Sequence, residues 1–199
     1  HLQLGASRIR TAQVIGPDGD RYVNKDDSGA TSLGSTLSFL LDLTDNALDP
    51  KRGWRLELIR DETTIFDGLH ARFASYDLNT SIYLPMGKKS TLAFNYFLGE
   101  AGLISKNTRT ENDLHSELSL NCSSISDSVL YNKCSATENL RVAERLREND
   151  YGSASSLGAP MQMRSFPLGR FHGSKTEFAS SELRLNFGEE NSHFDFGFL

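Results

Sequence analysis

Hydrophobic and polar residues alternate one by one along several stretches of the chain. In the clearest run, residues 37–43, apolar side chains stand at every second position: Leu37, Phe39, Leu41 and Leu43. Because successive side chains of a β-strand point to opposite faces of its sheet, this period of two predicts a strand with one apolar and one polar face. The pattern recurs at 1–15, 54–58, 74–84, 92–98, 181–187 and 194–198. We therefore expect an all-β, antiparallel fold of about seven strands.

The stretches between these runs differ in length in a regular way. Turn-forming residues mark short connections at 45–53, 85–89 and 188–191, whereas those at 17–32, 60–70 and about 101–175 are longer. Outer-membrane barrels combine short periplasmic turns with longer extracellular loops, and their strands turn an apolar side to lipid and a polar side to the lumen. The sequence thus favours a segment of a transmembrane antiparallel β-barrel with one long extracellular loop.

The long loop contains one region of helical character. Ser135 and Glu138 have the spacing of a capping box, and residues 139–148 carry apolar side chains at helical intervals. We expect a short surface helix that ends near 150–152, and we favour a solvated helix without a packing partner. The small residues of 152–158 then form a connector that lets the rest of the loop turn back.

Two cysteines, Cys122 and Cys134, are separated by a spacer rich in Ser, Asn and Asp, which places both in the long loop. A disulfide fits an exported loop and would remove roughly 3 kcal/mol of unfolded-state entropy. A zinc site is a weaker alternative, because no histidine is near enough in sequence to complete it. Free thiols are the remaining alternative.

Composition excludes some functions and leaves the barrel hypothesis open. The net charge of −5 shows no basic footprint, so we expect no nucleic-acid partner. No run approaches about 18 consecutive apolar residues. A mean hydropathy of −0.41 is compatible with strands that are only half apolar. The five histidines are scattered, and nucleophile-elbow and phosphate-loop motifs are missing. We expect no enzymatic activity, no catalytic residue, no metal and no cofactor.

The stretch 161–187 resembles a known family. Arg164-Ser165-Phe166 is followed by an arginine–aromatic pair, Arg170-Phe171, and then by a strand that contains Ser181-Glu182-Leu183-Arg184. This order is similar to that of the bacterial surface-antigen superfamily, the outer-membrane barrels of BamA/TamA-type insertases and their two-partner-secretion relatives. The Asp-Asn-x-x-x-Pro-x-x-Gly pattern of 45–53 is a second resemblance, because these barrels carry it at a periplasmic turn two hairpins before the arginine loop.

The resemblance implies a role for the tip of the long loop. In that family a Val-Arg-Gly-Phe/Tyr motif lies on an extracellular loop folded back into the barrel, and its arginine pairs with acidic residues of the inner wall. Residues 163–166 align with this motif, with Ser165 in place of glycine. The implied residues of this clamp between loop tip and lumen are Arg164, Phe166, Arg170, Glu182 and Asp195. Strand alternation agrees with the lumen position of Glu182 and Asp195.

A solvated alternative to the clamp stays open. Arg164 and Glu182 could both face water in the lumen, where an exposed ion pair contributes at most about 1 kcal/mol. The clamp instead predicts a guanidinium that holds a carboxylate inside a partly dry barrel.

The implied function is insertion, assembly or translocation of unfolded polypeptides at the bacterial outer membrane, in contact with its lipid. A barrel of this family has about sixteen strands, so we expect residues 1–199 to be one barrel domain that is incomplete at both ends, with periplasmic domains outside this chain as partners. One alternative is a barrel that translocates a fused lipase-like, patatin-type enzyme domain. Another is a plain pore or surface adhesin.

Overall fold

The computed structural model describes residues 1–9, 13–17, 19–23, 30–87, 89–158, 162–163, 165–167, 169–186 and 193–198. At Ile9, Asn186 and 193–198 it describes the backbone alone. Seven strands form one sheet: β1 (Leu2–Ile9), β4 (Ala30–Asp42), β5 (Gly53–Phe66), β6 (Arg72–Pro85), β7 (Ser90–Ser105), β8 (Lys175–Asn186) and β9 (His193–Phe198). Each pairs antiparallel with the next in that order. The prediction of an antiparallel β fold is confirmed at this level.

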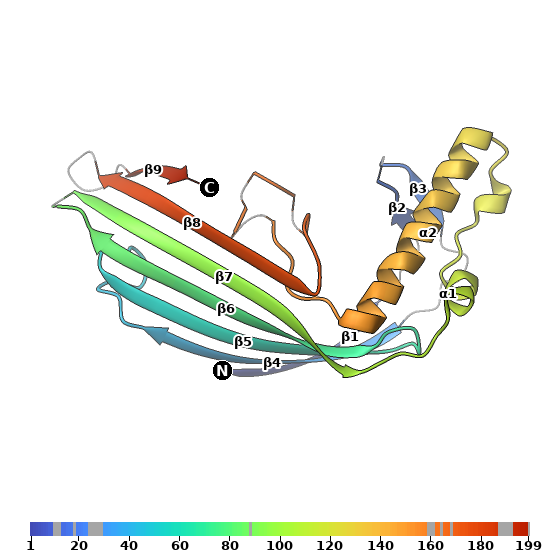
Figure 1. The fold of residues 1–199 in the computed structure, drawn as a ribbon, viewed down its shortest axis with the longest axis horizontal. Coiled ribbons are helices and arrows are strands. Elements are labelled where there is room, and N and C mark those ends of the chain that lie inside the picture. Colours follow the sequence, from blue (N-terminus) through green and yellow to red (C-terminus); the bar gives the residue numbers. More distant parts are fainter. Residues whose placement is uncertain are drawn as a thin grey trace.

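The sheet is curved, and its two faces differ in chemistry (Figure 1). The long connection between β7 and β8 lies over the concave face. Cross-strand partners in an antiparallel sheet share a face, so the register sorts the side chains. The apolar residues of the predicted lipid-facing side all fall on the convex face: Leu37, Phe39, Leu41, Leu56, Leu58, Leu92, Phe94, Leu183 and Leu185.

Apolar side chains on the convex face are largely uncovered. Phe39 and Leu58 are register partners, and they are 56% and 45% exposed. Trp54, Ile82 and Phe94 extend the same exposed surface across β5, β6 and β7. Serine, threonine, asparagine and charged side chains occupy most of the opposite, concave face. The apolar side chains of the sheet therefore point outward on its convex face, and little of their surface is buried within the described chain.

The connection between β7 and β8 carries a helical cap. It contains α1 (Glu111–Glu117), the 3-10 helix η1 (Cys122–Ser124) and α2 (Ser128–Tyr151). Leu114 of α1 and Val142 of α2 are buried against each other, with Leu118 beside them. The expectation of a helix without a packing partner was wrong, because α2 packs on α1, η1 and β7.

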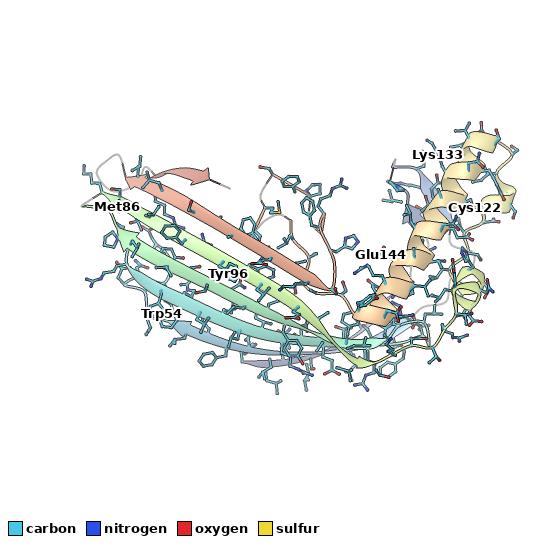
Figure 2. All side chains as sticks on the ribbon, in the orientation of Figure 1. Trp54, Met86, Tyr96, Cys122, Lys133 and Glu144 are labelled. Carbon is cyan, nitrogen blue, oxygen red and sulfur yellow. A yellow bond between two sulfur atoms is a disulfide. The ribbon has the colours of Figure 1, made fainter. Side chains whose placement is uncertain are left out.

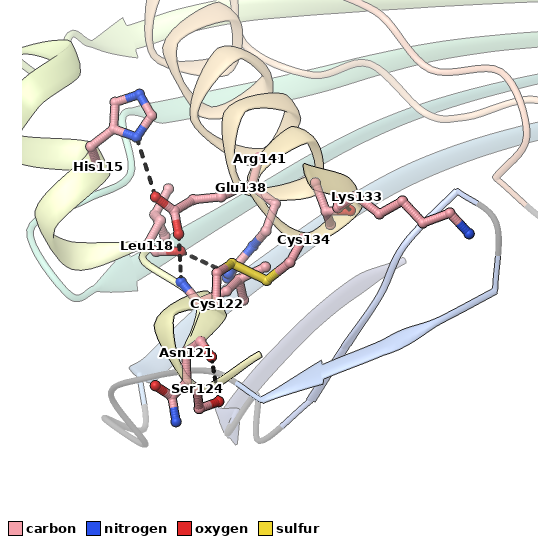
Figure 3. Close-up of a disulfide and its surroundings, with 11 residues drawn as sticks. His115, Leu118, Asn121, Cys122, Ser124, Lys133, Cys134, Glu138 and Arg141 are labelled. Carbon is pink, nitrogen blue, oxygen red and sulfur yellow. Dashed lines mark hydrogen bonds and ion pairs between the residues drawn. A yellow bond between two sulfur atoms is a disulfide. The ribbon is translucent and has the colours of Figure 1, made fainter. Parts of the chain in front are cut away.

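The predicted start of the helix was also wrong. Asp127 caps α2 by accepting hydrogen bonds from the backbone N–H groups of Val129 and Leu130. Glu138 does not close a capping box with Ser135, since both lie inside the helix. Its carboxylate instead accepts the N–H of Leu120 at 2.8 Å and lies 3.6 Å from His115 (Figure 3). The expected end is confirmed, because Gly152, at a φ of +74°, is the C-cap.

A second sheet, the ribbon of β2 (Gln13–Ile15) and β3 (Arg21–Val23), docks on this cap. Tyr22 is buried against Leu120 and the two cysteines. Cys122 and Cys134 form a disulfide with a Cα–Cα distance of 5.7 Å (Figures 2 and 3), which confirms the predicted pairing. The disulfide therefore links η1 to α2 in the centre of a small buried cluster that spans two connections of the sheet.

Two predicted loops are shorter than expected. Strand β5 continues through residues 60–66, and β7 continues to Ser105, so the connections are 67–71 and 106–174. The first is shorter than the turn over 43–52 at the opposite end of the sheet. The expected alternation of long and short connections therefore fails at 67–71. The last predicted turn, 188–191, lies outside the described residues.

The turn between β4 and β5 is fixed by its own side chains. Asp45 accepts the N–H groups of Lys51 and Arg52 at 2.9 and 3.0 Å, and these hydrogen bonds lower the pKa of its carboxyl group. Gly53 closes the turn at a φ of +111°, and a Cβ there would collide with the backbone of Leu43. The residues that made this stretch recognisable as a turn are thus the ones that build it.

Candidate functional site

The segment that follows α2 folds back over the concave face of the sheet (Figure 1). Leu157 and Phe171 exchange backbone hydrogen bonds of 2.8 and 3.1 Å, and the N–H of Ala154 donates to Gly173. The two arms of this segment, 152–158 and 169–174, therefore run side by side. Ala154 and Leu157 are buried, so the small residues of the predicted connector serve close packing as well as turning.

A hydrogen-bonded chain fastens the first arm to the sheet. The Ser155 hydroxyl donates to Asp77 Oδ2 on β6 at 2.6 Å, and the Thr176 hydroxyl on β8 donates to the Ser155 carbonyl at 2.6 Å. Gly99 on β7 lies between them, and a Cβ there would come within 2.7 Å of the Thr176 hydroxyl. The missing side chain at Gly99 leaves the room that this contact needs.

Two further contacts fix the end of α2 and the second arm. Asn149, buried near the end of α2, accepts the N–H of Ala71 at 2.8 Å and donates to the carbonyl of Leu69 at 3.1 Å. His172 of the second arm lies 2.8 Å from Glu144 of α2. The arms are thus fixed to the sheet at one side and to the cap at the other.

The wall predicted to receive the loop tip carries a charged pair. Glu182 and Arg184 lie on the concave side of β8, where their register partners on β7 are Ala93 and Thr91. Their side chains form an ion pair of 3.3 Å, and the Arg184 guanidinium lies 5.5 Å from the centre of the Tyr83 ring. Glu182 therefore lies on the concave face of the sheet, and its partner among the described side chains is Arg184.

Some of the predicted loop-tip residues lie within the part of the chain that the structure describes. Arg164 lies outside the described residues, so the predicted contact with Glu182 stays a prediction. Phe166 and Phe171 pack edge to face with ring centres 5.2 Å apart, and Arg170 beside them is exposed. Asp195 is the register partner of Arg184 on β9, and its side chain lies outside the described part.

The concave face has an acidic balance. Five carboxylates on β4 to β8 (Asp42, Glu57, Asp61, Asp77 and Glu182) share it with two guanidiniums, Arg55 and Arg184. Arg55 pairs with Asp42 at 2.6 Å. Among the described residues, His, Cys, Asp and Glu side chains form no group of three or more that could hold a metal ion. This face therefore offers hydrogen-bonding groups and an excess of negative charge.

Sequence reasoning missed the residues that fasten the loop. Alternation placed Asp77 on the polar side of its strand, but nothing local marks Ser155 as its partner or Asn149 as the partner of Ala71, because each contact joins positions far apart in the chain. The single available signal is the run of small residues at 152–158, which permits close approach to a sheet.

Comparisons with known proteins give no family for this chain. A scan of protein-family models, a search of curated proteins and a search of solved structures each found no match. In the part of the chain that the structure describes, no helix is both long and apolar enough to cross a membrane.

Proposed function

We propose that this chain is part of a transmembrane β-barrel of the surface-antigen type, which inserts or translocates unfolded polypeptides at the bacterial outer membrane. The observation that carries the proposal is the two-sided sheet. Its convex face exposes aliphatic and aromatic side chains over neighbouring strands, for example Leu37, Phe39 and Leu58, at 54%, 56% and 45%. A contiguous apolar surface of this kind requires an apolar partner, and hydrocarbon is the partner that fits strands with a polar reverse side.

The fastened loop supports the translocation part of the proposal. In the proposed barrel, a long connection that returns over the polar face and is tied there through Ser155 and Asp77 would narrow the lumen. A tethered loop distinguishes this function from a plain pore, for which we expect a steady open conductance in lipid bilayers.

The chain's single tryptophan tests the membrane position directly. Trp54 lies on the convex face beside Ile82 and is 39% exposed. In the reconstituted protein we expect lipids brominated on their acyl chains to quench Trp54 fluorescence strongly, since bromine in the acyl region reaches side chains that face hydrocarbon. Water-soluble brominated compounds added to the buffer should quench Trp54 fluorescence only weakly.

A matched control moves the fluorophore to the other face. In the double variant Trp54→Phe, Phe178→Trp the tryptophan lies on the concave side of β8, where Phe97 is its partner. Acyl-chain bromine should leave this variant nearly unquenched. Equal quenching of the two proteins would remove the basis for a lipid-facing convex side and a lumen-facing concave side.

The proposed role of the loop tip is a clamp between Arg164 and Glu182. A planar guanidinium satisfies a wall carboxylate better than an ammonium does, so Arg164→Lys should impair activity although the charge is kept. Glu182→Gln should act in the same direction. The combined variant should be less than additive in activity, because both changes remove one interaction.

Arg184 supplies the necessary control for this cycle, because it is the described partner of Glu182. If Glu182→Gln acted only through Arg184, then Glu182→Gln would be non-additive with Arg184→Gln and additive with Arg164→Lys. That outcome would rule out the clamp and leave the barrel proposal standing.

A further inference from the structure

The convex face contains a slot where the apolar surface meets charged residues. A cavity of about 350 Å³ lies over β4 to β7, and Phe39, Leu58 and Leu98 form its apolar part. Arg60, Tyr76 and Glu100 line the adjoining row of the sheet. The volume falls within the range of about 300–1,000 Å³ that is usual for small-ligand sites. The slot therefore combines a hydrophobic floor with one polar edge.

Positive charge is in excess at one end of this edge. Arg60 and Arg72 both bind the carboxylate of Glu62, at 2.7 and 3.0 Å. Two guanidiniums on one carboxylate leave a net charge of +1. Their side chains are 39% and 50% exposed, so N–H donors stay accessible to a further anion.

The aromatic ring of Tyr76 gives the charged end a fixed shape. The Arg60 guanidinium lies 5.9 Å from the ring centre. The ring itself rests over Gly102, where an added Cβ would come within 2.9 Å of it. Glu100 lies at the opposite end of the row, with Lys175 as its register partner. An anionic group is therefore favoured at the Arg60 end and disfavoured at the Glu100 end.

We propose that this slot binds a membrane lipid that carries a phosphate group, with an acyl chain over Phe39, Leu58 and Leu98 and a phosphate oxygen at Arg60. This inference rests on the proposed function, which places the convex face in lipid. Arginine at the edge of an apolar surface matches the boundary where acyl chains meet headgroups, and its forked donors suit phosphate oxygens. A free phosphate ion would use Arg60 without using the apolar floor.

Native mass spectrometry of the protein released from detergent micelles tests this site. The probe is phosphatidylglycerol, compared with a diacylglycerol of the same acyl chains and with inorganic phosphate. We expect a retained phosphatidylglycerol adduct, little diacylglycerol adduct and no displacement by phosphate. Arg60→Gln should lower retention about tenfold, which is the loss expected for one charged hydrogen bond.

Two matched variants separate charge from shape. Lys51→Gln removes a cation in the turn at 43–52, far from the slot, and should retain the lipid as the unaltered protein does. Leu58→Trp fills the slot while Arg60 is kept, so it should lower retention as well. Leu58 is 45% exposed, so the larger side chain can be accepted without repacking a core.

Each outcome decides the proposal. Unchanged retention in both Arg60→Gln and Leu58→Trp, equal retention of diacylglycerol, or displacement by inorganic phosphate would overturn the lipid site. Quenching of Trp54 by brominated lipid, measured on the unaltered protein and on Arg60→Gln, reports the membrane position separately; Leu58→Trp is left out of this measurement because it adds a second fluorophore. Lost lipid selectivity with intact quenching would refute this inference alone, whereas absent quenching would refute the proposed function.

Discussion

The helical cap and the sheet place their apolar side chains in opposite environments. In the cap, Leu114 and Val142 are 0% and 1% exposed, as in an ordinary water-soluble core. On the convex face of the sheet, Phe39 and Leu37 are 56% and 54% exposed. Leucine occurs in both sets, so residue type alone does not explain the contrast.

The contrast teaches that the two regions are stabilised by different means. The cap gains stability by removing apolar surface from water within the protein. The sheet is held together by a ladder of backbone hydrogen bonds between neighbouring strands, and many apolar side chains of its convex face stay exposed. Changes to one region should therefore leave the other largely intact, and the following predictions test this separation in order of decreasing effect.

The largest effect is expected in the core of the cap. Leu114→Ala should destabilise the cap by about 2–5 kcal/mol, because it removes a fully buried side chain and leaves a cavity. Hydrogen exchange should show faster exchange of α1 and α2 amides and little change in the sheet. Leu140→Ala on the exposed side of α2 is the control and should change little. Simultaneous loss of protection in β5 and β6 would contradict independent stabilisation.

The second effect distinguishes the two faces of the sheet. Leu41 and Leu40 are neighbours on β4, yet the register places Leu41 on the convex face and Leu40 on the concave face. If Leu41 lies at the bilayer midplane, Leu41→Arg should destabilise the vesicle-inserted protein by about 2–4 kcal/mol, which is the cost of a charge at that depth. Leu40→Arg should cost much less, because its face is polar. Urea titration of vesicle-inserted protein measures both, and equal losses would speak against a lipid-facing side.

The faces of the sheet could be predicted because alternation is a local property. The immediate sequence neighbours of Leu37, Phe39 and Leu41 are enough to predict which face each side chain occupies, without any knowledge of the rest of the fold. The ends of β5 could not be predicted in this way. Beyond Leu58 the convex face carries Arg60 and Glu62, so alternation disappears while the hydrogen-bonded ladder continues. The hydrophobic pattern marks only the part of a strand that has an apolar face, whereas the hydrogen-bonded ladder sets the length of the strand.

The candidate site was harder to predict for a related reason. The face that Glu182 occupies followed from alternation along its strand, and the disulfide between Cys122 and Cys134 was the favoured one of three alternatives. The ties from Ser155 to Asp77 and from Asn149 to Ala71 join residues far apart in sequence, and polar side chains of this kind have many plausible partners. The start of α2 was missed because Asp127 stands in a stretch of equally good capping residues.

The third effect concerns the disulfide, which belongs to the cap alone. Replacing Cys122 and Cys134 together by serine should destabilise the cap by about 3 kcal/mol, because the unfolded chain gains conformational entropy when the cross-link is removed. Tyr22 packs on this disulfide, so the ribbon β2–β3 should become more accessible to protease. Limited proteolysis reports on the cap and its ribbon, and the circular dichroism signal of β-structure reports on the sheet. The two measurements therefore follow the two regions separately. Treating the unaltered protein with a reductant should reproduce the variant, and loss of the sheet signal in either case would show that the regions are coupled.

The smallest effect lies at the end of the sheet opposite the cap, in the turn that Asp45 holds together. The pKa of Asp45 is lowered because its carboxylate accepts the backbone N–H groups of Lys51 and Arg52. A carboxyl group whose pKa is lower in the folded state stabilises that state above its unfolded pKa of about 3.9, and the contribution is lost as the pH falls through the folded value. The stability difference between the unaltered protein and Asp45→Asn should thus be greatest near neutral pH and shrink below about pH 4. Asp49→Asn, which removes an exposed carboxylate 4.0 Å from Lys51 in the same turn, is the matched control for the loss of one negative charge. Urea titrations at several pH values measure both variants, and a difference that grows on acidification would mean that Asp45 does not act through its charged form.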